Sequence, residues 1–340
     1  MSKLKNSPLA AKDKMKAAVF YKYGSPDVLK ITEIEKPVPK DDEVLVKIHA
    51  ASVNAYDWHI LRADPFFTRF LTGLFRPHNN ILGADIAGVV ESVGKSVTKY
   101  KTGDEVYACL ESCGKGGIAA GGFAEYVCAK EAVLAPKPSS VSFEEAAALP
   151  MAAVTALQGL RDAGQIKPGQ SVLINGASGG VGTFAVQIAK ALGAEVTGVC
   201  SPGSVEMVHS LGTDYVIDYT KEDFVKNGRQ YDLILDIAAN RSVSDYRLSL
   251  KPNGICVVVG FSTIRRMLSV AFAAKLDGKK ITILAAKNAY GGELLNINKL
   301  IESGKLKSVI DSRFNLNDAA EAILQIETEH PKGKVIVNIV

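Results

Sequence analysis

A regular alternation of strands and helices that begins at Ser171 constrains the fold of this 340-residue chain more than any other feature. Strands separated by helices form right-handed βαβ units, and a series of such units builds a doubly wound parallel sheet. The pattern therefore predicts an α/β fold with a six-stranded parallel sheet and a helix between successive strands. The six expected strands are SVLIN, EVTGVC, DYVIDY, YDLILDIA, ICVVVG and KKITILAA.

The turn after the first of these strands is rich in glycine and leads directly into a helix. Glycines at such a turn let the backbone bend tightly and approach a pyrophosphate, whose charge the amides of the helix N-terminus can meet. The spacing is G-x-x-G-x-x-G, which is a weak motif alone but specific at this place in a strand series. We therefore predict a dinucleotide site, rather than a purely structural turn, at Gly176, Ala177, Ser178, Gly179, Gly180, Val181 and Gly182.

The end of the second strand distinguishes between the two nicotinamide dinucleotides. In NAD-binding proteins an acidic residue about 20 residues after the glycine turn accepts hydrogen bonds from the ribose hydroxyls. Here Ser201 and Ser204 occupy this region, and the first acid, Glu206, lies inside the next helix. A neutral pocket with hydroxyl groups accepts a 2′-phosphate that a carboxylate would repel. The sequence therefore predicts NADPH, although no Arg or Lys stands there to bind the phosphate.

The first 140 residues have a different pattern, in which short β-branched runs are separated by Gly, Pro, Asp and Lys. This is typical of a small barrel or rolled sheet. A capping box of Ser142 and Glu145 then opens an Ala/Leu-rich helix that marks the change of pattern. After Lys287 the chain continues as helix, strand, helix and strand. Because this last segment lies beyond the six strands, we expect it to return to the first domain.

Charge and composition exclude several classes of protein. The formal charge of +4 equals that of the first sixteen residues, which hold five lysines and one aspartate, so the remaining body is neutral. A nucleic-acid binder would carry a basic stripe on its folded part. Residues 1–14 are expected to form a flexible basic tail without a secretory signal, and no apolar run approaches the roughly 20 residues of a membrane span. Five scattered cysteines indicate reduced thiols, and hence a cytoplasmic protein.

Four stretches together resemble a known family: GASGGVGTFAVQIAKALGAEV, ILGADIAGVVESVGKSVTKYKTGDEV, LPMAAVTALQGL and GKVIVNIV. From about Met15 onward the chain is similar to the zinc-independent quinone oxidoreductase branch of the medium-chain dehydrogenase/reductase superfamily. The resemblance implies a GroES-like β-barrel domain over 15–140, a Rossmann dinucleotide-binding domain over 141–286 and a C-terminal segment, 287–340, that completes the first domain. It also implies an NADPH-dependent enzyme that delivers hydride to a quinone or an α,β-unsaturated carbonyl compound.

Zinc alcohol dehydrogenases of the same superfamily carry a Cys, a Gly-His-Glu and a second Cys as catalytic ligands. By motif alignment these places are Asn54, Gly83-Ala84-Asp85 and Met151, and the four-Cys structural lobe is missing. Zinc takes Cys, His or carboxylate ligands, so only Asp85 could serve, and we predict no metal. Without a Lewis acid, quinones and enones are easier acceptors than plain ketones, because hydride addition leaves a delocalised enolate or phenolate.

The resemblance also places side chains around the cofactor. It implies that Asn54 holds the nicotinamide or the substrate carbonyl, the alternative being an ordinary turn residue. Tyr56 and His59 could each donate a proton to the developing oxyanion, unless solvent does so and both only pack. Further residues implied beside the nicotinamide are Thr155, Gly260 and Phe261, and around the adenosine phosphate Ser201, Ser204 and Tyr219.

Residues 64–80 place several large apolar side chains at helical spacing: Phe66, Phe67, Phe70, Leu71, Leu74 and Phe75. The first interpretation is a helix that packs this stripe on the core. The alternatives are an apolar wall over the substrate, which would favour hydrophobic acceptors, and an interfacial membrane contact supported by neighbouring arginines.

Other functions also fit part of the pattern. Residues 176–180 satisfy the G-x-S-x-G of a hydrolase nucleophile elbow at Ser178, with Asp236 and His330 in the right chain order, but Gly182 and the β-rich first part then stay unexplained. A cofactor-binding scaffold or sensor with little turnover also stays open, because a fold and a cofactor site do not establish catalysis. The sixth strand would form a sheet edge that relatives often pair, so we expect a homodimer.

Overall fold

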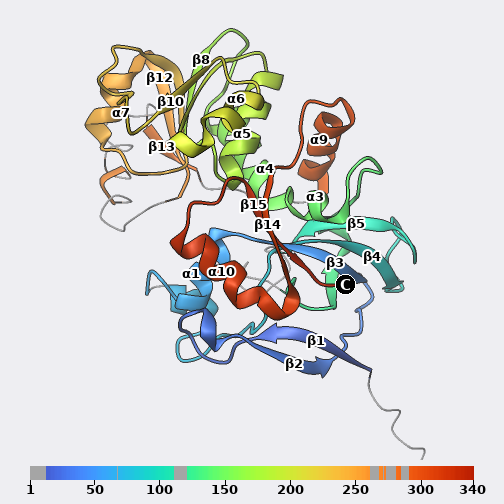
Figure 1. The fold of residues 1–340 in the computed structure, drawn as a ribbon. Coiled ribbons are helices and arrows are strands. Elements are labelled where there is room, and N and C mark those ends of the chain that lie inside the picture. The colour runs from blue at the N-terminus through green and yellow to red at the C-terminus, as the bar shows by residue number, and fades with distance from the viewer. Residues whose placement is uncertain are drawn as a thin grey trace, which may run out of the picture.

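The computed structural model describes residues 13–66, 68–110, 121–260, 268–270, 272, 281–284 and 291–340. These residues form two domains, each built around its own sheet (Figure 1). The C-terminal segment, red in Figure 1, passes from the edge of the parallel sheet into the sheet of the first domain. The last strands of the chain thereby join the sheet that the first part of the chain forms.

The second domain contains the predicted six-stranded parallel sheet. Its strand order is β10-β9-β8-β11-β12-β13, which is the Rossmann order 3-2-1-4-5-6, and every neighbouring pair is parallel. The α/β fold class is therefore confirmed. The strands are β8 (Ser171–Asn175), β9 (Glu195–Cys200), β10 (Tyr215–Asp218), β11 (Tyr231–Asp236), β12 (Leu250–Val258) and β13 (Ile281–Ile283).

The helices of this domain are α5 (Gly180–Ala191), α6 (Val205–Ser210) and α7 (Val243–Ser249). The predicted helix between β10 and β11 is wrong, because residues 219–230 form turns. Asp218, Asp223 and Asn227 each accept a hydrogen bond from a backbone N–H two residues further on. Such local bonds compete with helical hydrogen bonding, and they hold this segment in turns.

The first domain contains a mainly antiparallel sheet in the order β14-β15-β3-β4-β5-β7, with β6 also paired to β3. The C-terminal strand β15 runs antiparallel to β3, with Val335 opposite Val53. A separate antiparallel pair, β1 and β2, joins this domain through an isolated bridge between Ala17 and Ala124. The strands are β1 (Lys14–Val19), β2 (Lys30–Glu35), β3 (Glu43–Val53), β4 (Asp85–Val93), β5 (Glu105–Cys109), β6 (Tyr126–Lys130), β7 (Leu134–Pro136), β14 (Ile310–Asn315) and β15 (Lys334–Asn338).

The helical segment after residue 140 connects the two domains. The predicted capping box is present, since Glu145 N donates to Ser142 Oγ at 3.1 Å and Ser142 N donates to Glu145 Oε2 at 2.8 Å. The helix is not continuous, because Pro150 has no N–H for a helix interior and instead takes the first position of a second helix. The segment therefore divides into α3 (Phe143–Ala147), α4 (Pro150–Gln158) and a π-helical turn, η5 (Gly159–Ala163). Further α-helices in the described ranges include α1 (Ala55–Arg62), α2 (Thr68–Thr72), α9 (Gly291–Glu302) and α10 (Ala319–Thr328).

The apolar stripe of residues 64–80 does not pack on the core, so the first interpretation of that segment is wrong. Phe70 is 73% exposed and Phe75 is 89% exposed, whereas Thr72 is buried. The helix α2 has only five residues and is followed by Gly73 at φ +125°, so no continuous helical face forms. Phe67 lies outside the described residues. None of the helices in the described ranges is long and apolar enough to cross a membrane.

Candidate active site

The glycine-rich turn lies where β8 ends and α5 begins, and its glycines have different structural roles. Gly176 adopts φ +90°, which a residue with a side chain rarely does. A Cβ on Gly182 would lie 2.0 Å from Gly176 O, so this position needs glycine for close packing of helix on strand. A Cβ on Gly179 would meet no described atom closer than Gly176 O at 3.8 Å. Gly179 therefore leaves an open face beside the start of α5.

This open face fits the pyrophosphate of a dinucleotide. The first N–H groups of an α-helix have no partner within the helix, and α5 is twelve residues long with Gly179, which has no side chain, at its N-cap. Backbone donors at the turn can therefore meet a phosphate. Ala177 and Gly182 are buried, and Ser178, Gly180 and Val181 are partly exposed at the turn.

A buried network fixes the strand ends beside this turn. Asn175 donates from Nδ2 to Asp236 Oδ1 at 2.8 Å, and the Tyr246 hydroxyl donates to Asp236 Oδ2 at 2.5 Å. Burial raises the pKa of Asp236, and the hydrogen bonds from Tyr246, Ala239 and Asn175 act in the opposite direction. This network ties β8 to β11, and both oxygens of Asp236 accept bonds within it.

The end of β9 holds the residues predicted for the adenosine phosphate. Ser204 is buried, and its hydroxyl lies 3.2 Å from that of Ser201. Tyr219 is 51% exposed just after β10, the neighbouring strand. The structure adds a cation that the sequence did not reveal there, because Lys332 Nζ lies 3.4 Å from the position that a Cβ would take on Gly203. The lysine comes from the C-terminal segment, far from β9 in the sequence.

Gly333, the residue after Lys332, lies beside the glycine-rich turn. Gly333 forms an isolated parallel bridge with Gly179, and β15 then begins at Lys334. A Cβ on Gly180 would lie 3.0 Å from Lys334 Cδ, so the lysine stem passes directly beside the start of α5. The C-terminal segment thus joins the dinucleotide turn to the sheet of the first domain.

The Lys334 side chain ends in an ammonium group that lies in a buried polar cluster next to α1. It donates to Asn54 Oδ1 at 2.5 Å and lies 3.9 Å from Asp85 Oδ2. Asn54 Nδ2 donates to Asp85 Oδ2 at 3.0 Å, and Met151 N, at the start of α4, donates to Asp85 Oδ1 at 3.1 Å. The cluster therefore brings Asn54, Asp85 and Met151 together, although they come from three separate elements.

Two buried carboxylates in this cluster have shifted acidities. Burial raises the pKa of Asp57 to about 7, although Asn54 N and Gly83 N donate to its carboxylate. Burial also raises the pKa of Asp85, and the positive charge of Lys334 opposes this shift. Burial lowers the pKa of Lys334, while Asp85 and Asp57 oppose that change. The three groups thus depend on one another for charge balance.

The two candidate proton donors lie on α1, directly after Asn54. Tyr56 is partly buried, between the cores of the two domains. His59 stacks on Trp58 and places Nδ1 2.7 Å from Asp64 O. Because a carbonyl oxygen can only accept, Nδ1 carries a hydrogen, and His59 could donate a second proton only as imidazolium. Thr155 lies on α4 one turn after Met151, Gly260 follows β12 with φ +80°, and Phe261 lies outside the described residues.

The side chains at the positions of the zinc ligands do not fit a zinc ion. Asn54 offers a carboxamide, Met151 contributes a backbone N–H, and the Asp85 carboxylate is already bonded to both of them and to Ser52. The ammonium of Lys334 also approaches this place. Among the residues that the structure describes, no group of three or more His, Cys, Asp or Glu could hold a metal ion.

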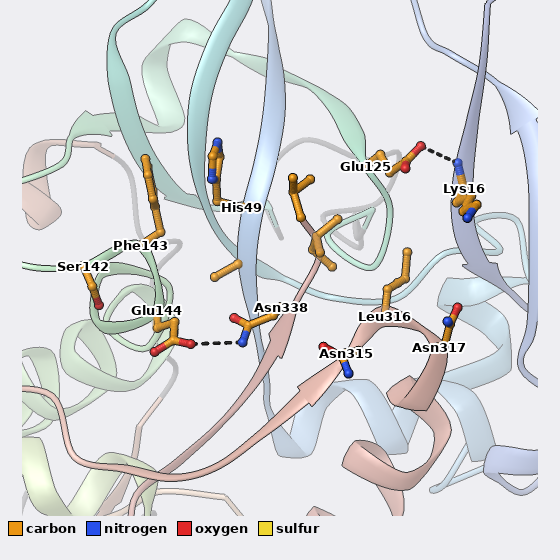
Figure 2. A pocket seen from close by; sticks show the side chains of 13 residues that line it. Lys16, His49, Glu125, Ser142, Phe143, Glu144, Asn315, Leu316, Asn317 and Asn338 are labelled. Carbon is orange, nitrogen blue, oxygen red and sulfur yellow. Dashed lines mark hydrogen bonds between the residues drawn. The ribbon is translucent and has the colours of Figure 1, made fainter.

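A separate cavity of about 610 Å³ lies on the first domain and contains none of these residues. Figure 2 shows His49 and Phe143 on one side of it and Asn315 and Asn317 on another, with Glu144 bonded to Asn338. The His49 and Phe143 rings stack at 4.3 Å. The glycine turn and the Asn54 cluster therefore lie outside this cavity.

Comparison with known proteins agrees with this geometry. Residues 40–139 match the alcohol dehydrogenase GroES-like domain, and residues 211–337 match a family described as zinc-binding dehydrogenase. The 2-methylene-furan-3-one reductase of Solanum lycopersicum is 34% identical over 98% of this chain and 81% of its own length. The chain belongs to the medium-chain dehydrogenase/reductase superfamily. It is therefore an oxidoreductase of a family that binds a nicotinamide cofactor.

Other members of this superfamily are similar over nearly the whole chain. The chloroplastic NADPH-dependent alkenal/one oxidoreductase of Arabidopsis thaliana is 34% identical over 95% of this chain and 79% of its own length. The structure of the quinone oxidoreductase from Coxiella burnetii superposes with a TM-score of 0.84 and 31% identity, covering 96% of this chain and 100% of the other. The resemblance to quinone oxidoreductases inferred from the sequence is confirmed.

Proposed function

We propose that this enzyme transfers hydride from NADPH to a quinone or an α,β-unsaturated carbonyl compound without a metal. The observation that carries the proposal is the course of residues 332–334. Lys332 lies beside Gly203, Gly333 bridges to Gly179 in the glycine-rich turn, and Lys334 binds Asn54. In this proposal the cofactor and acceptor sites lie next to each other along residues 332–334. The names of the relatives, an enone-type reductase, an alkenal oxidoreductase and a quinone oxidoreductase, support this class of acceptor.

The residues of this chain supply binding, orientation and protons. A bound nicotinamide would supply the hydride, and the acceptor then needs one proton to complete its reduction. Asn54 Nδ2 can offer its second hydrogen to the acceptor oxygen by exchanging its long hydrogen bond to Ser52 O, in which Nδ2 and the oxygen are 3.4 Å apart. Such a donor stabilises the negative charge that develops on the oxygen. Tyr56 or His59 then donates the proton, or solvent does.

The preference for NADPH rests on the end of β9. Ser201 and Ser204 bring hydroxyl groups, and Lys332 brings a positive charge, to the place where the adenosine ribose binds in this fold. A cation and two hydroxyl groups suit a 2′-phosphate. None of these three groups is a carboxylate, which is the group that accepts hydrogen bonds from the ribose hydroxyls of NADH. NADPH should therefore bind more tightly than NADH, and tighter binding of NADH would contradict this assignment.

The absence of a metal from the reaction is part of the proposal, and the donor set at Asn54, Asp85 and Met151 supports it. Elemental analysis of the purified enzyme tests it directly. Zinc at one equivalent per chain, together with loss of activity on chelation, would overturn the metal-free mechanism.

The deciding experiment for the function is NADPH oxidation measured against a panel of quinones, enones, enals and plain ketones. We expect turnover with the conjugated acceptors and little with plain ketones, since only the former leave a delocalised anion. Binding of NADPH without turnover of any acceptor would favour a scaffold or sensor. The serine hydrolase alternative is tested by labelling of Ser178 with a fluorophosphonate probe, which we expect to fail.

Three further assignments accompany this proposal. The domain limits are 15–140, 141–286 and 287–340, with a flexible tail over 1–14, and limited proteolysis would test them. A homodimer would pair through β13, the last strand of the parallel sheet within the described residues, and sedimentation velocity would test it. A cytoplasmic location is the third assignment, whereas a relative is chloroplastic, and localisation of a tagged protein would test it.

A further inference from the structure

The Lys334 side chain is one of the most unusual features of this molecule, because it is a charged lysine with only 3% of its surface exposed. Its ammonium donates to Asn54 Oδ1 at 2.5 Å and to Val53 O at 3.2 Å. A lysine loses its hydration on burial, and it is tolerated only where acceptors and counter-charges replace water. Two carbonyl-type oxygens and the nearby Asp85 carboxylate do so here.

These bonds determine which way the Asn54 carboxamide is turned. An ammonium can only donate, so the atom of Asn54 that faces Lys334 must be the oxygen. The nitrogen of Asn54 then faces Asp85, whose carboxylate accepts at 3.0 Å. The reverse orientation would place the NH₂ group against an ammonium and the oxygen against a carboxylate. Lys334 and Asp85 thus permit one orientation of Asn54.

We propose that Lys334 is a positioning residue, which acts through Asn54 to make that side chain an obligate hydrogen-bond donor to the oxygen of the acceptor. The inference rests on the proposed function. The Asn54 oxygen is held by Lys334 and one N–H by Asp85, while the second N–H makes a long hydrogen bond to Ser52 O, 3.4 Å from Nδ2, which the oxygen of an acceptor can replace. This geometry selects acceptors with a carbonyl oxygen and stabilises the enolate or phenolate that reduction produces.

The same lysine connects this donor to the dinucleotide turn. Its backbone follows Gly333, which bridges Gly179, and its Cδ would lie 3.0 Å from a Cβ on Gly180. The lysine stem is therefore held by the turn at one end while its ammonium holds Asn54 at the other. Displacement of the turn would shift the ammonium and with it the orientation of Asn54.

The proposal is tested by a double-mutant cycle on Lys334→Met and Asn54→Ala. We expect Lys334→Met to lower kcat for enone or quinone reduction by at least about tenfold, because Asn54 is no longer held as a donor. In the Asn54→Ala background the same Lys334→Met change should alter kcat by less than about twofold, since a residue that acts through Asn54 has nothing left to act on. Equal losses in both backgrounds, or an unchanged kcat in Lys334→Met, would overturn the proposal.

A matched control separates positioning from the general cost of removing a buried lysine. The Lys137 side chain is 5% exposed, lies in the first domain and pairs with Glu105 at 3.0 Å. Lys137→Met should lower the unfolding temperature but leave kcat and KM unchanged. If Lys334→Met does not fold because Asp85 is left unpaired, the cycle is run with Asp85→Asn present in every variant, which removes the buried negative charge as well.

A second variant tests the donor without altering Lys334. Asn54→Asp keeps the shape and the acceptor for the ammonium but removes both N–H groups, so kcat should fall about as far as in Asn54→Ala. A kcat retained in Asn54→Asp up to high pH, where the new carboxyl group beside Asp85 is ionised and can no longer donate, would contradict a donor role.

An NMR measurement separates failure of this inference from failure of the proposed function. The side-chain NH₂ signals of Asn54, identified by their loss in Asn54→Ala, should shift in Lys334→Met without any acceptor present. If the wild type reduces no acceptor, the proposed function fails, and unchanged NH₂ signals would show separately that Lys334 does not orient Asn54.

Discussion

Lys332 Nζ and the backbone of Gly203 lie side by side, with 3.4 Å between the ammonium nitrogen and the position of a Cβ on the glycine. The two residues belong to different parts of the chain and meet because β15 returns to the first domain along the edge of the parallel sheet. The contact places a positive charge beside Ser201 and Ser204. A site that looked neutral in the sequence is therefore basic in the fold.

We expect Lys332→Ala to weaken NADPH binding by about tenfold, the usual scale of one charge-assisted hydrogen bond. NADH has no 2′-phosphate, so its dissociation constant should change by less than about twofold. Titration of cofactor fluorescence measures both constants. The control is Lys305→Ala, an exposed lysine that is not part of this site. Equal weakening of NADH and NADPH would show that Lys332 does not contact the phosphate.

The glycines of the turn should respond differently to substitution by alanine. A Cβ on Gly182 would lie 2.0 Å from Gly176 O, so Gly182→Ala must move backbone and should lower the unfolding temperature of the enzyme without cofactor. Gly179→Ala adds a methyl group in open space and should leave that temperature unchanged. It should nevertheless weaken NADPH binding, because the methyl group occupies the face that fits the pyrophosphate.

Calorimetry with and without NADPH measures both effects in the two variants. A fall in the unfolding temperature of Gly179→Ala without cofactor would contradict the assignment of its open face to the ligand.

Local patterns were sufficient for most of the second domain. The six strands and the glycine turn were predicted because each is a short run whose own residues determine it, and β8 ends at Asn175 just before the turn. The helix expected between β10 and β11 was wrong because Asp218, Asp223 and Asn227 favour turns through bonds two residues away. Side-chain competition of this kind is easily missed when only the spacing of apolar residues is considered.

Contacts between distant segments were beyond what local patterns could predict. The Lys334 and Asn54 side chains are separated by 280 positions, and their contact depends on the register of β15 against β3. The closing Gly-Lys of the sequence contributed to the family resemblance but gave no role for the lysine. The exposed side chains of Phe70 and Phe75 were misjudged for the related reason that a five-residue helix has no extended face.

Substitution of the two candidate proton donors should separate their roles. We expect Tyr56→Phe to lower kcat by at least about 100-fold, the lower end of the scale of general acid catalysis. His59→Asn should change kcat at neutral pH by less than about twofold, because the Nδ1 hydrogen of His59 is already bonded to Asp64 O. Steady-state rates with one quinone and one enone provide the measurement. If neither variant changes kcat, the proton comes from solvent.

The buried carboxyl of Asp57 should make stability depend on pH. Its pKa is raised by burial to about 7 in the folded enzyme, against an ordinary value of 3.8 for an Asp in water. The folded state therefore binds the proton more tightly than the unfolded chain, and Asp57 favours folding most at low pH. This contribution is lost as the pH rises from about 4 to about 7, with a slope of at most about 1.4 kcal/mol per pH unit.

Asp57→Asn removes the titration, so the comparison with the wild type isolates this group from all others. The variant also loses one acceptor for the N–H groups of Asn54 and Gly83, and it should be less stable overall. The free energy of unfolding of the wild type minus that of the variant should decrease between pH 4 and pH 7 and become constant above that range. Urea unfolding at a series of pH values measures this difference. A difference that is constant, or that increases with pH, would show that folding does not raise the pKa of Asp57.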